Sequence, residues 1–173
     1  MDEKQKVSRP GMGRRFAWLA ILALMVGLTA FYQALIPKKG GLVETSGEGG
    51  SARVILQSDR SGHYRVEGMI NGQAVNFLVD TGATDVAVSE QAARALGLEF
   101  GPRTMVMTAA GPVSAWKTRI ASVSAGNLER KNVRATITPG LGGEALLGMS
   151  FLRHYSIRQQ DDRLLIESPE SNQ

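Results

Sequence analysis

The stretch FLVDTGAT, residues 77–84, decides the fold of this chain. Its first three residues are apolar and predict a buried strand. Asp80 ends that strand, and a threonine and a glycine then turn the chain sharply. Gly82 lacks a side chain, so its backbone N–H can approach and hold the carboxylate of Asp80. The stretch therefore predicts an acid presented at a rigid corner, with the strand before it fixed in the core.

Short alternating segments on both sides of this corner predict strands. Asn71-Gly72 is a two-residue hairpin signal, because both positions need a positive φ. Ser89 is the expected N-cap of a short helix that ends at Gly97. The predicted strands are 53–58, 63–70, 73–79, 86–88, 104–108, 113–121, 133–137, 145–147, 155–158 and 164–167, and the predicted helices are 91–96 and 149–153. The predicted fold class is mainly β with one or two short helices.

The composition excludes several classes of protein. The chain has 173 residues and no cysteine, which rules out disulfide frameworks, thiolate catalysis and cysteine-bound zinc. Its two histidines, His63 and His154, lie in no metal-binding spacing, so we expect neither a metal nor a cofactor. Residues 1–15 carry five basic residues against two acids and hold most of the net charge of +4. A basic tail on a nearly neutral domain argues against a nucleic-acid partner.

Residues 16–36, FAWLAILALMVGLTAFYQALI, predict a transmembrane helix. The segment has no charged side chain, and at about 1.5 Å per residue it matches the roughly 30 Å hydrocarbon core of a bilayer. Basic pairs flank it, and Trp18 and Tyr32 lie near its two ends. A buried core helix is the alternative, which the flanking charges disfavour. The heavier positive charge before the span predicts a single-pass protein of the inner membrane, with a cytoplasmic N-terminus and a periplasmic domain.

A cleaved signal peptide is another interpretation of this segment. Its apolar run exceeds the usual signal core, and Leu28-Thr29-Ala30 is a poor cleavage site, so we favour an uncleaved anchor. Residues 37–52 contain five glycines with serines and charges and predict a flexible linker. Residues 53–168 form the predicted folded domain, and residues 169–173 form a C-terminal tail.

The chemistry open to Asp80 requires a second carboxylate. A lone exposed aspartate is a poor base, and at neutral pH it is not an acid. Two aspartates that face each other share one proton, so one acts as a base on a water while the other acts as an acid toward a peptide carbonyl. The chain has one Asp-Thr-Gly, and Asp59, Asp161 and Asp162 lie in turn-like settings. The second Asp80 is therefore expected from another copy of the chain, related by two-fold symmetry.

The corner and two later segments together resemble the retropepsin-like aspartic proteases, and in particular the bacterial, membrane-anchored branch of that family. The segments are DTGAT at 80–84, a glycine-tipped hairpin, and LLGMSFL at 146–152, in that order. The resemblance covers roughly residues 53–168. It implies a retropepsin-like acid protease half-barrel that acts as a homodimer on protein or peptide substrates.

The resemblance also implies a role for each residue of the corner. Asp80 is similar to the catalytic aspartate of the family. Thr81 corresponds to the residue that grips across the dimer, and Gly82 to the backbone that supports the carboxylate. Ala83 and Thr84 complete the active-site loop.

Two further segments receive roles from the resemblance. The hairpin at 107–113 looks like the flap that closes over the substrate, and a glycine suits the tip of a mobile lid. The implied flap tip is Ala109, Ala110 and Gly111, and the implied support behind the catalytic loop is Leu146, Leu147 and Gly148.

The sequence departs from the family at one place. Viral members often have an acid at the position of Thr84 and an arginine at the position of Met149, and these two side chains pair. Both are absent here, which bears on substrate-backbone binding and dimer strength and leaves the catalytic corner intact. Asp85 is either a partial replacement for the missing acid or a turn residue.

Two other functions are alternatives to the aspartic endopeptidase. DTGAT also fits the D-x-G-x-T phosphate-binding corner of actin/Hsp70-like ATPases, but that fold needs a second phosphate loop, two α/β lobes and a longer chain. A non-catalytic, membrane-tethered homodimeric β-module for binding or assembly would keep the fold without the reaction. The complete Asp80-Thr81-Gly82 corner argues against such a module, because binding alone does not need it.

Overall fold

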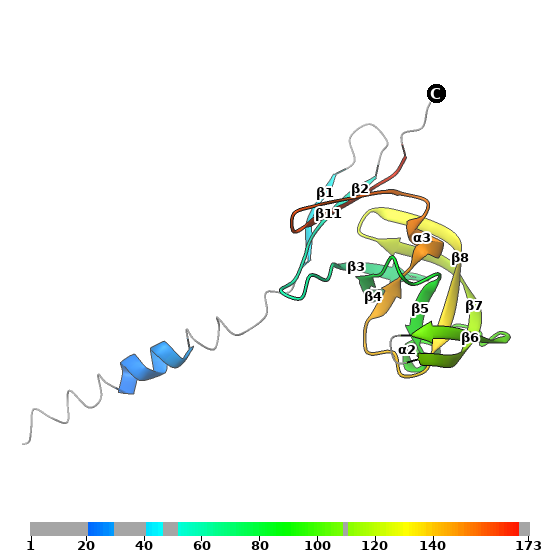
Figure 1. The fold of residues 1–173 in the computed structure, drawn as a ribbon, viewed down its shortest axis with the longest axis horizontal. Helices are drawn as coiled ribbons and strands as arrows, with labels where there is room; N and C mark the ends of the chain where they lie inside the picture. Colours follow the sequence, from blue (N-terminus) through cyan, green and yellow to red (C-terminus); the bar gives the residue numbers. More distant parts are fainter. Residues whose placement is uncertain (1–20, 30–40, 47–51, 109–110, 170–173) are drawn as a thin grey trace, which may run out of the picture. The chain divides into compact units, whose positions relative to one another are not determined.

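The computed structural model describes residues 21–29, 41–46, 52–108 and 111–169. The chain divides into two units, Met1–Pro37 and Lys38–Gln173 (Figure 1). In the first unit, residues 21–29 are helical, with exposed apolar side chains. Over the described residues, no helix is long and apolar enough to cross a membrane. The two ends of the predicted span lie outside the described residues, as do the tail before it and residues 170–173, so the transmembrane helix stays a prediction.

The second unit is mainly β, as predicted, and its described residues form two sheets and two short helices. The strands are β1 (Leu42–Ser46), β2 (Arg53–Gln57), β3 (Arg65–Ile70), β4 (Gln73–Val79), β5 (Val86–Ser89), β6 (Arg103–Thr108), β7 (Gly111–Ala125), β8 (Leu128–Thr138), β9 (Ala145–Leu147), β10 (Ser156–Gln160) and β11 (Arg163–Glu167), and the helices are α2 (Glu90–Ala95) and α3 (Met149–Leu152).

The larger sheet has seven strands in the order β3-β4-β9-β5-β8-β7-β6, and β3 also pairs with β7, so the sheet closes on itself. Two of its pairs are parallel, β4 with β9 and β5 with β8. Gly68 makes the closure possible, because a Cβ at this position would lie 2.0 Å from the backbone oxygen of Ser124. The closed sheet encloses a core whose largest fully buried side chains include Phe77, Ile120 and Phe151.

The smaller sheet has the order β1-β2-β11-β10. Its first strand corrects the linker predicted over residues 37–52, because β1 pairs with β2 in antiparallel register from Leu42 to Ser46. Glycines surround this segment, and they gave it the composition of a tether. The intervening LVETS is compatible with a strand once β2 supplies a partner edge. The turn between β10 and β11 is at Asp161-Asp162, as predicted, with Asp161 at a φ of 51°.

Of the ten predicted strands, eight have different bounds in the structure, by at most two residues at an end except in β7 and β8. β7 and β8 extend far beyond 113–121 and 133–137 and meet in a turn at Gly126, which has a φ of 58°. Polar residues such as Ser122 and Lys131 lie within these extensions and hid the strand pattern in the sequence. β3 starts at Arg65 instead of His63, because the side chain of Asp59 holds the preceding residues in a turn.

Candidate active site

Asp80 lies at the end of β4, and its backbone is fixed from both sides. The Asp80 N–H donates to the carbonyl of Leu147 at 3.2 Å, so β9 holds the corner in line with the parallel ladder. The Ala83 N–H donates to the Asp80 carbonyl at 3.2 Å and closes the turn. The carboxylate itself is half-buried, and its Oδ1 accepts a hydrogen bond of 2.9 Å from the N–H of Gly82. The corner therefore presents one preorganised carboxylate, as the sequence predicted.

Helix α3 supports this corner from behind. Its first N–H groups donate to the carbonyls of the loop, Met149 to Ala83 at 2.8 Å and Ser150 to Thr84 at 2.9 Å. Gly148 permits this approach, since a Cβ there would lie 2.2 Å from the carbonyl oxygen of Asp85. The predicted segment behind the loop is thus where the resemblance implied it, with Leu147 buried and Leu146 half-buried beside β4.

Ser150 is a supporting residue that the sequence reasoning missed. Its side chain is buried, with its hydroxyl accepting from the Val86 N–H at 2.9 Å and donating to the Arg134 carbonyl at 2.7 Å. These two bonds tie α3 to β5 and to β8. A serine within the otherwise apolar MSFL was the available signal, because a buried hydroxyl needs hydrogen-bond partners.

Thr81 and Thr84 both point to the surface of the protomer. Thr81 is exposed, and its hydroxyl makes no hydrogen bond within the described part of the chain. Thr84 is also exposed, and its backbone carbonyl is occupied by Ser150. The exposed Thr81 hydroxyl is therefore available for a hydrogen bond to a group outside the described protomer.

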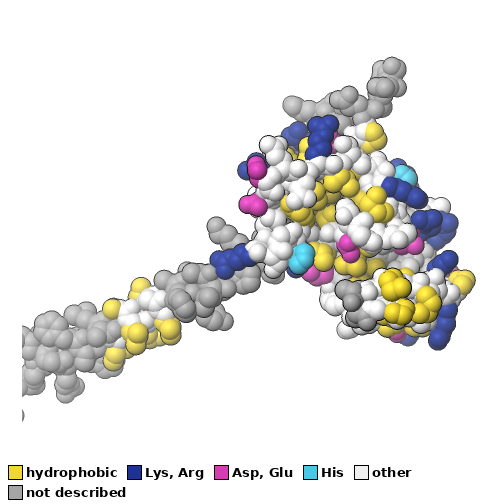
Figure 2. Space-filling view, viewed as in Figure 1, with side chains coloured by type: hydrophobic (Ala, Val, Ile, Leu, Met, Phe, Trp, Pro, Cys, Tyr) yellow, Lys and Arg dark blue, Asp and Glu magenta, His cyan; other side chains and the backbone are white. Residues whose placement is uncertain are grey.

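The predicted flap corresponds to the hairpin of β6 and β7. The strands pair from Arg103 with Trp116 to Thr108 with Gly111, and the Thr108 hydroxyl donates to the Gly111 carbonyl at 2.8 Å. Ala109 and Ala110, the rest of the implied tip, lie outside the described residues. Figure 2 shows hydrophobic side chains at the surface over this hairpin, where Met105 is 63% exposed and Met107 is 82% exposed. Over its described residues, the hairpin thus presents exposed apolar side chains.

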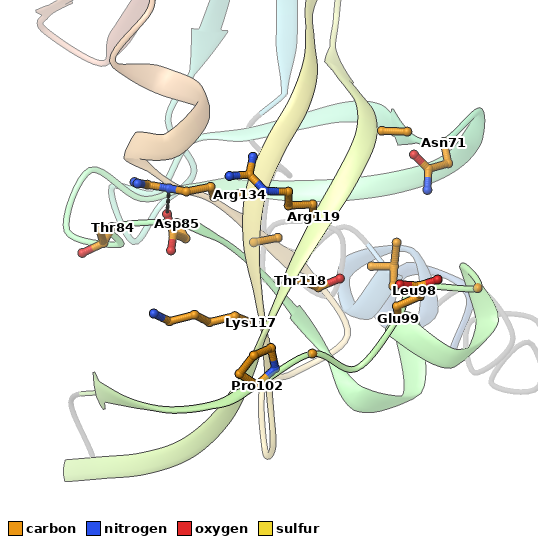
Figure 3. Close-up of a pocket in the computed structure, with 14 residues that line it drawn as sticks. Asn71, Thr84, Asp85, Leu98, Glu99, Pro102, Lys117, Thr118, Arg119 and Arg134 are labelled. Carbon is orange, nitrogen blue, oxygen red and sulfur yellow. Dashed lines mark hydrogen bonds and ion pairs between the residues drawn. The ribbon is translucent and has the colours of Figure 1, made fainter.

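Asp85 forms an ion pair next to the corner. Arg134 on β8 places its Nε 3.3 Å from Asp85 Oδ1 (Figure 3). Arg134 is on β8, whereas the arginine of the viral family members would occupy the position of Met149, on α3. The sequence left Asp85 open between an acid role and a turn role, and the structure gives its carboxylate a cationic partner that the sequence reasoning missed.

An open groove of about 760 Å³ begins at Thr84 and Asp85 and continues along β7. Lys117 and Arg119 on β7 line it together with Arg134, as Figure 3 shows. Asp80 is not among the residues that line this groove. The groove therefore borders the corner without enclosing the carboxylate.

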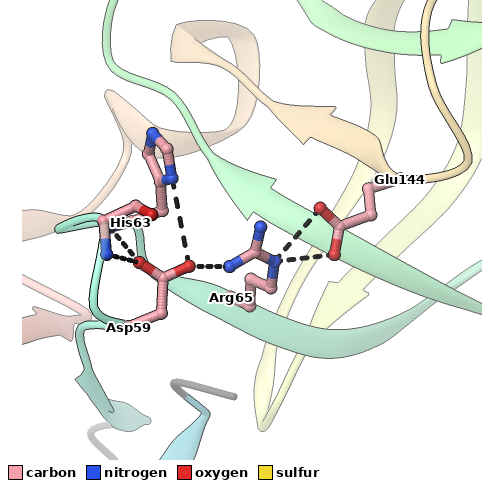
Figure 4. Close-up of polar contacts among 5 residues, drawn as sticks. Asp59, His63, Arg65 and Glu144 are labelled. Atoms are coloured by element: carbon pink, nitrogen blue, oxygen red, sulfur yellow. Dashed lines mark hydrogen bonds and ion pairs between the residues drawn. The ribbon is translucent and has the colours of Figure 1, made fainter. Parts of the chain in front are cut away.

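A second charged cluster, Asp59, Arg65 and Glu144, lies beside β4 (Figure 4). Arg65 Nε contacts both Glu144 oxygens, at 2.8 and 3.1 Å, and its Nη1 donates to Asp59. The Glu144 hydrogen bond, followed by that to Asp59, raises the pKa of Arg65. The pKa of Asp59 is lowered, chiefly by the backbone N–H of His63, and burial only partly opposes this. Asp59 is thus a structural turn residue, as predicted.

No group of three or more histidine, cysteine, aspartate and glutamate side chains within the described ranges has a metal-binding arrangement.

Residues 66–154 match the sequence model of the family described as "gag-polyprotein putative aspartyl protease". The chain belongs to the retropepsin-like aspartic proteases.

A solved structure agrees with this family and with the fold. The crystal structure of a retropepsin-like aspartic protease from Rickettsia conorii is 27% identical, with a TM-score of 0.59, over 72% of this chain and 94% of that one. An uncharacterized protein encoded in the cobV 5′ region of Sinorhizobium sp. is 34% identical over 122 residues, 68% of this chain and 52% of the relative. An uncharacterized protein of Rickettsia prowazekii (strain Madrid E) is 32% identical over 117 residues, 65% of this chain and 50% of the relative. This retropepsin-like chain spans about half the length of these two curated relatives.

Proposed function

We propose that this protein is an aspartic endopeptidase in which two protomers each supply one Asp80 to a single catalytic site. The observation that carries the proposal is the half-buried Asp80 carboxylate, held at 2.9 Å by the N–H of Gly82 at the end of a buried strand. A catalytic carboxylate requires such a fixed position, because a carboxylate that had to move into place during the reaction would slow it.

The proposed reaction is the hydrolysis of a peptide bond by a water held between the two carboxylates. The ionised Asp80 removes a proton from the water, whose oxygen attacks the peptide carbonyl carbon. The protonated Asp80 of the other protomer donates to the carbonyl oxygen, so the intermediate is a neutral diol. When the intermediate collapses, a proton passes to the leaving nitrogen and the C–N bond breaks. Because the dyad must hold one shared proton, we expect an acidic to mildly acidic optimum.

The dimer is supported by what the single protomer leaves open. The sequence has one Asp-Thr-Gly, and the exposed Thr81 hydroxyl has no partner within the described protomer. A two-fold axis beside the corner would bring the second Asp80 and the second Thr81 to the same place. Retropepsin-like proteases act on peptides and are often dimers, which agrees with this arrangement. The exposed face of the β6–β7 hairpin, with Met105 and Met107, would then close over the bound peptide as a flap.

We further propose that residues 16–36 anchor the protein as a single span in the inner membrane, with the protease unit in the periplasm. The uncharged sequence of the segment and its basic flanks support this. Residues 21–29 agree with it, because they are helical and their large apolar side chains are exposed. Confinement to a membrane would raise the effective concentration of protomers and favour the dimer.

The test of the proposed function compares two aspartate variants of the full chain in detergent. Asp80→Asn should abolish cleavage of a peptide library at pH 4–7, with an unchanged melting temperature. Asp161→Asn is the matched control, because this exposed turn residue has a φ of 51° that asparagine tolerates, so it should cleave like the wild type. Cleavage by Asp80→Asn at the wild-type rate would refute the catalytic assignment.

The dimer is tested by dilution. If each site needs two protomers, the rate per protomer should fall once the concentration drops below the dimer dissociation constant. A rate per protomer that stays constant to the lowest measurable concentration, together with a monomeric mass in solution, would refute the shared site.

A further inference from the structure

The charged cluster of Asp59, Arg65 and Glu144 spans β4 just before the catalytic corner. Arg65 is on β3 and Glu144 directly precedes β9, so the Arg65–Glu144 pair crosses over the strand that delivers Asp80 (Figure 4). The sequence separation between the two pairing residues is 79, which shows that only the fold brings them together.

The strand register places this cluster on the same face as the Asp80 carboxylate. Arg65 is directly opposite Leu78, and Leu78 is directly opposite Leu146, so these three side chains share one face. Their neighbours Phe77, Ala145 and Leu147 are buried on the opposite face. The backbone hydrogen bonds of β4 with the neighbouring chain segments continue up to Asp80. The Val79 N–H donates to the Tyr64 carbonyl, and the Asp80 N–H donates to the Leu147 carbonyl.

Alternation along β4 then puts Asp80 on the face of Leu78, about 7 Å further along the strand. Leu78 and Leu146 are both half-buried, so they form an apolar shelf beside the carboxylate. Glu144 is two residues before Leu146 and pairs with Arg65 over this shelf, which confirms that its side chain is on the same face. The apolar shelf of Leu78 and Leu146 is therefore bordered by a charged rim, which consists of the side chains of Asp59, Arg65 and Glu144.

Among Asp59, Arg65 and Glu144, two carboxylates share one guanidinium, whose Nε and Nη1 are both committed to them. His63 lies on the Asp59 side of this cluster, with its Nδ1 3.9 Å from Asp59 Oδ2, so the Glu144 carboxylate has Arg65 as its cationic neighbour in the cluster. The two acids differ in access, because the side chain of Asp59 is 10% exposed and that of Glu144 is 38% exposed. The surplus negative charge is thus presented to solvent through Glu144.

We propose that the shelf of Leu78 and Leu146, with Glu144 at its rim, selects a lysine or arginine side chain of the peptide substrate close to the scissile bond. The long aliphatic stem of such a side chain packs on the two leucines, and its cationic head reaches the Glu144 carboxylate. An acidic side chain at the same position meets the surplus negative charge and is disfavoured. This inference deepens the proposed function and rests on it.

The test uses three peptides that differ only at one position next to the scissile bond, which carries lysine, leucine or glutamate. Wild-type full chain should have the highest kcat/KM for the lysine peptide and the lowest for the glutamate peptide. Glu144→Gln should lower the lysine-to-leucine ratio of kcat/KM by about fivefold, the effect of one partly exposed ion pair. Most of this change should appear in KM, because the contact is away from the reacting atoms. Glu144→Asp, which retains the charge, should recover part of the preference.

Two controls separate a substrate contact from a structural one. Glu129→Gln removes an exposed acid from β8 and should leave all three ratios as in the wild type. Melting temperatures of all variants show whether a change in the ratio accompanies a loss of fold. Glutamate preferred over lysine by the wild type, or a lysine-to-leucine ratio unchanged in a folded Glu144→Gln, would overturn the inference.

Binding to an inactive variant distinguishes this inference from the proposed function. Asp80→Asn should bind the lysine peptide more tightly than the leucine and glutamate peptides, and Asp80→Asn combined with Glu144→Gln should lose that order. If wild type cleaves none of the peptides while this binding order holds, the catalytic proposal fails and the cationic subsite stands. If cleavage depends on Asp80 but the binding order is absent, the subsite fails alone.

Discussion

Ser150 offers a direct test of how the loop at 80–84 is held. Its hydroxyl is the partner of the Val86 N–H at 2.9 Å and of the Arg134 carbonyl at 2.7 Å, and the residue is only 5% exposed. Ser150→Ala leaves both backbone groups without this partner in the interior, and each unsatisfied group costs about 1–3 kcal/mol. We therefore expect the free energy of unfolding to fall by about 2–6 kcal/mol, the sum of the two penalties. At about 4 °C per kcal/mol for a unit of this size, Tm should decrease by about 8–24 °C.

Ser124 provides the matched control for this substitution. Its Oγ is buried and has no hydrogen-bond partner among the described residues. Ser124→Ala makes the same chemical change as Ser150→Ala but removes an unsatisfied hydroxyl, so stability should stay the same or rise. Urea unfolding followed by tryptophan fluorescence and circular dichroism measures both variants. Equal losses of stability in Ser150→Ala and Ser124→Ala would refute the role given to the Ser150 hydrogen bonds.

Three further predictions concern contacts at the corner and beside β4. Gly148→Ala places a Cβ 2.2 Å from the Asp85 carbonyl oxygen, so this variant should not fold into soluble protein. Gly143→Ala, whose Cβ would meet no atom within 4 Å, should express normally, and equal soluble yields of the two variants would contradict the close packing at Gly148. The Asp85–Arg134 pair is partly exposed, so a double-mutant cycle with Asp85→Asn and Arg134→Gln should give a coupling of about 1 kcal/mol or less. Because the folded-state pKa of Asp59 lies below its ordinary value of 3.8, its carboxylate stabilises the fold above pH 3.8 and this contribution is lost as the pH falls through the folded value. The stability difference between wild type and Asp59→Asn should therefore shrink below about pH 4 in a pH series of urea unfolding, and a difference that grows there would contradict the assignment.

The local parts of the fold and of the site could be predicted from the sequence because their causes are local. The hairpin at Asn71-Gly72 has both residues at positive φ, at 50° and 80°. Ser89 caps α2 by accepting from the Ala92 N–H. Gly82 holds the Asp80 carboxylate, as the DTG spacing indicated. In each case, neighbouring residues supply both partners of the interaction.

The parts that escaped prediction depend on partners far apart in the chain. Asp85 and Arg134 are separated by 49 residues, and Arg65 and Glu144 by 79. An isolated arginine or glutamate in a strand has no local pattern that names its partner, so only the assembled sheet reveals the pair. β1 was missed for the same reason, since its pairing with β2 stabilises it more than its own composition does.

The hydrogen bonds around Asp80 have a consequence for the order of events during synthesis. The loop at 80–84 is bonded to Leu147, Met149 and Ser150, which follow it by more than sixty residues. The barrel also closes only when β3 meets β7. Contacts of such long sequence separation slow folding, because the intervening chain must be closed into loops first. A nascent chain on the ribosome therefore contains Asp80 long before it contains the hydrogen-bond partners of the 80–84 loop, and this loop can reach its final bonding only after residues 147–150 have been made.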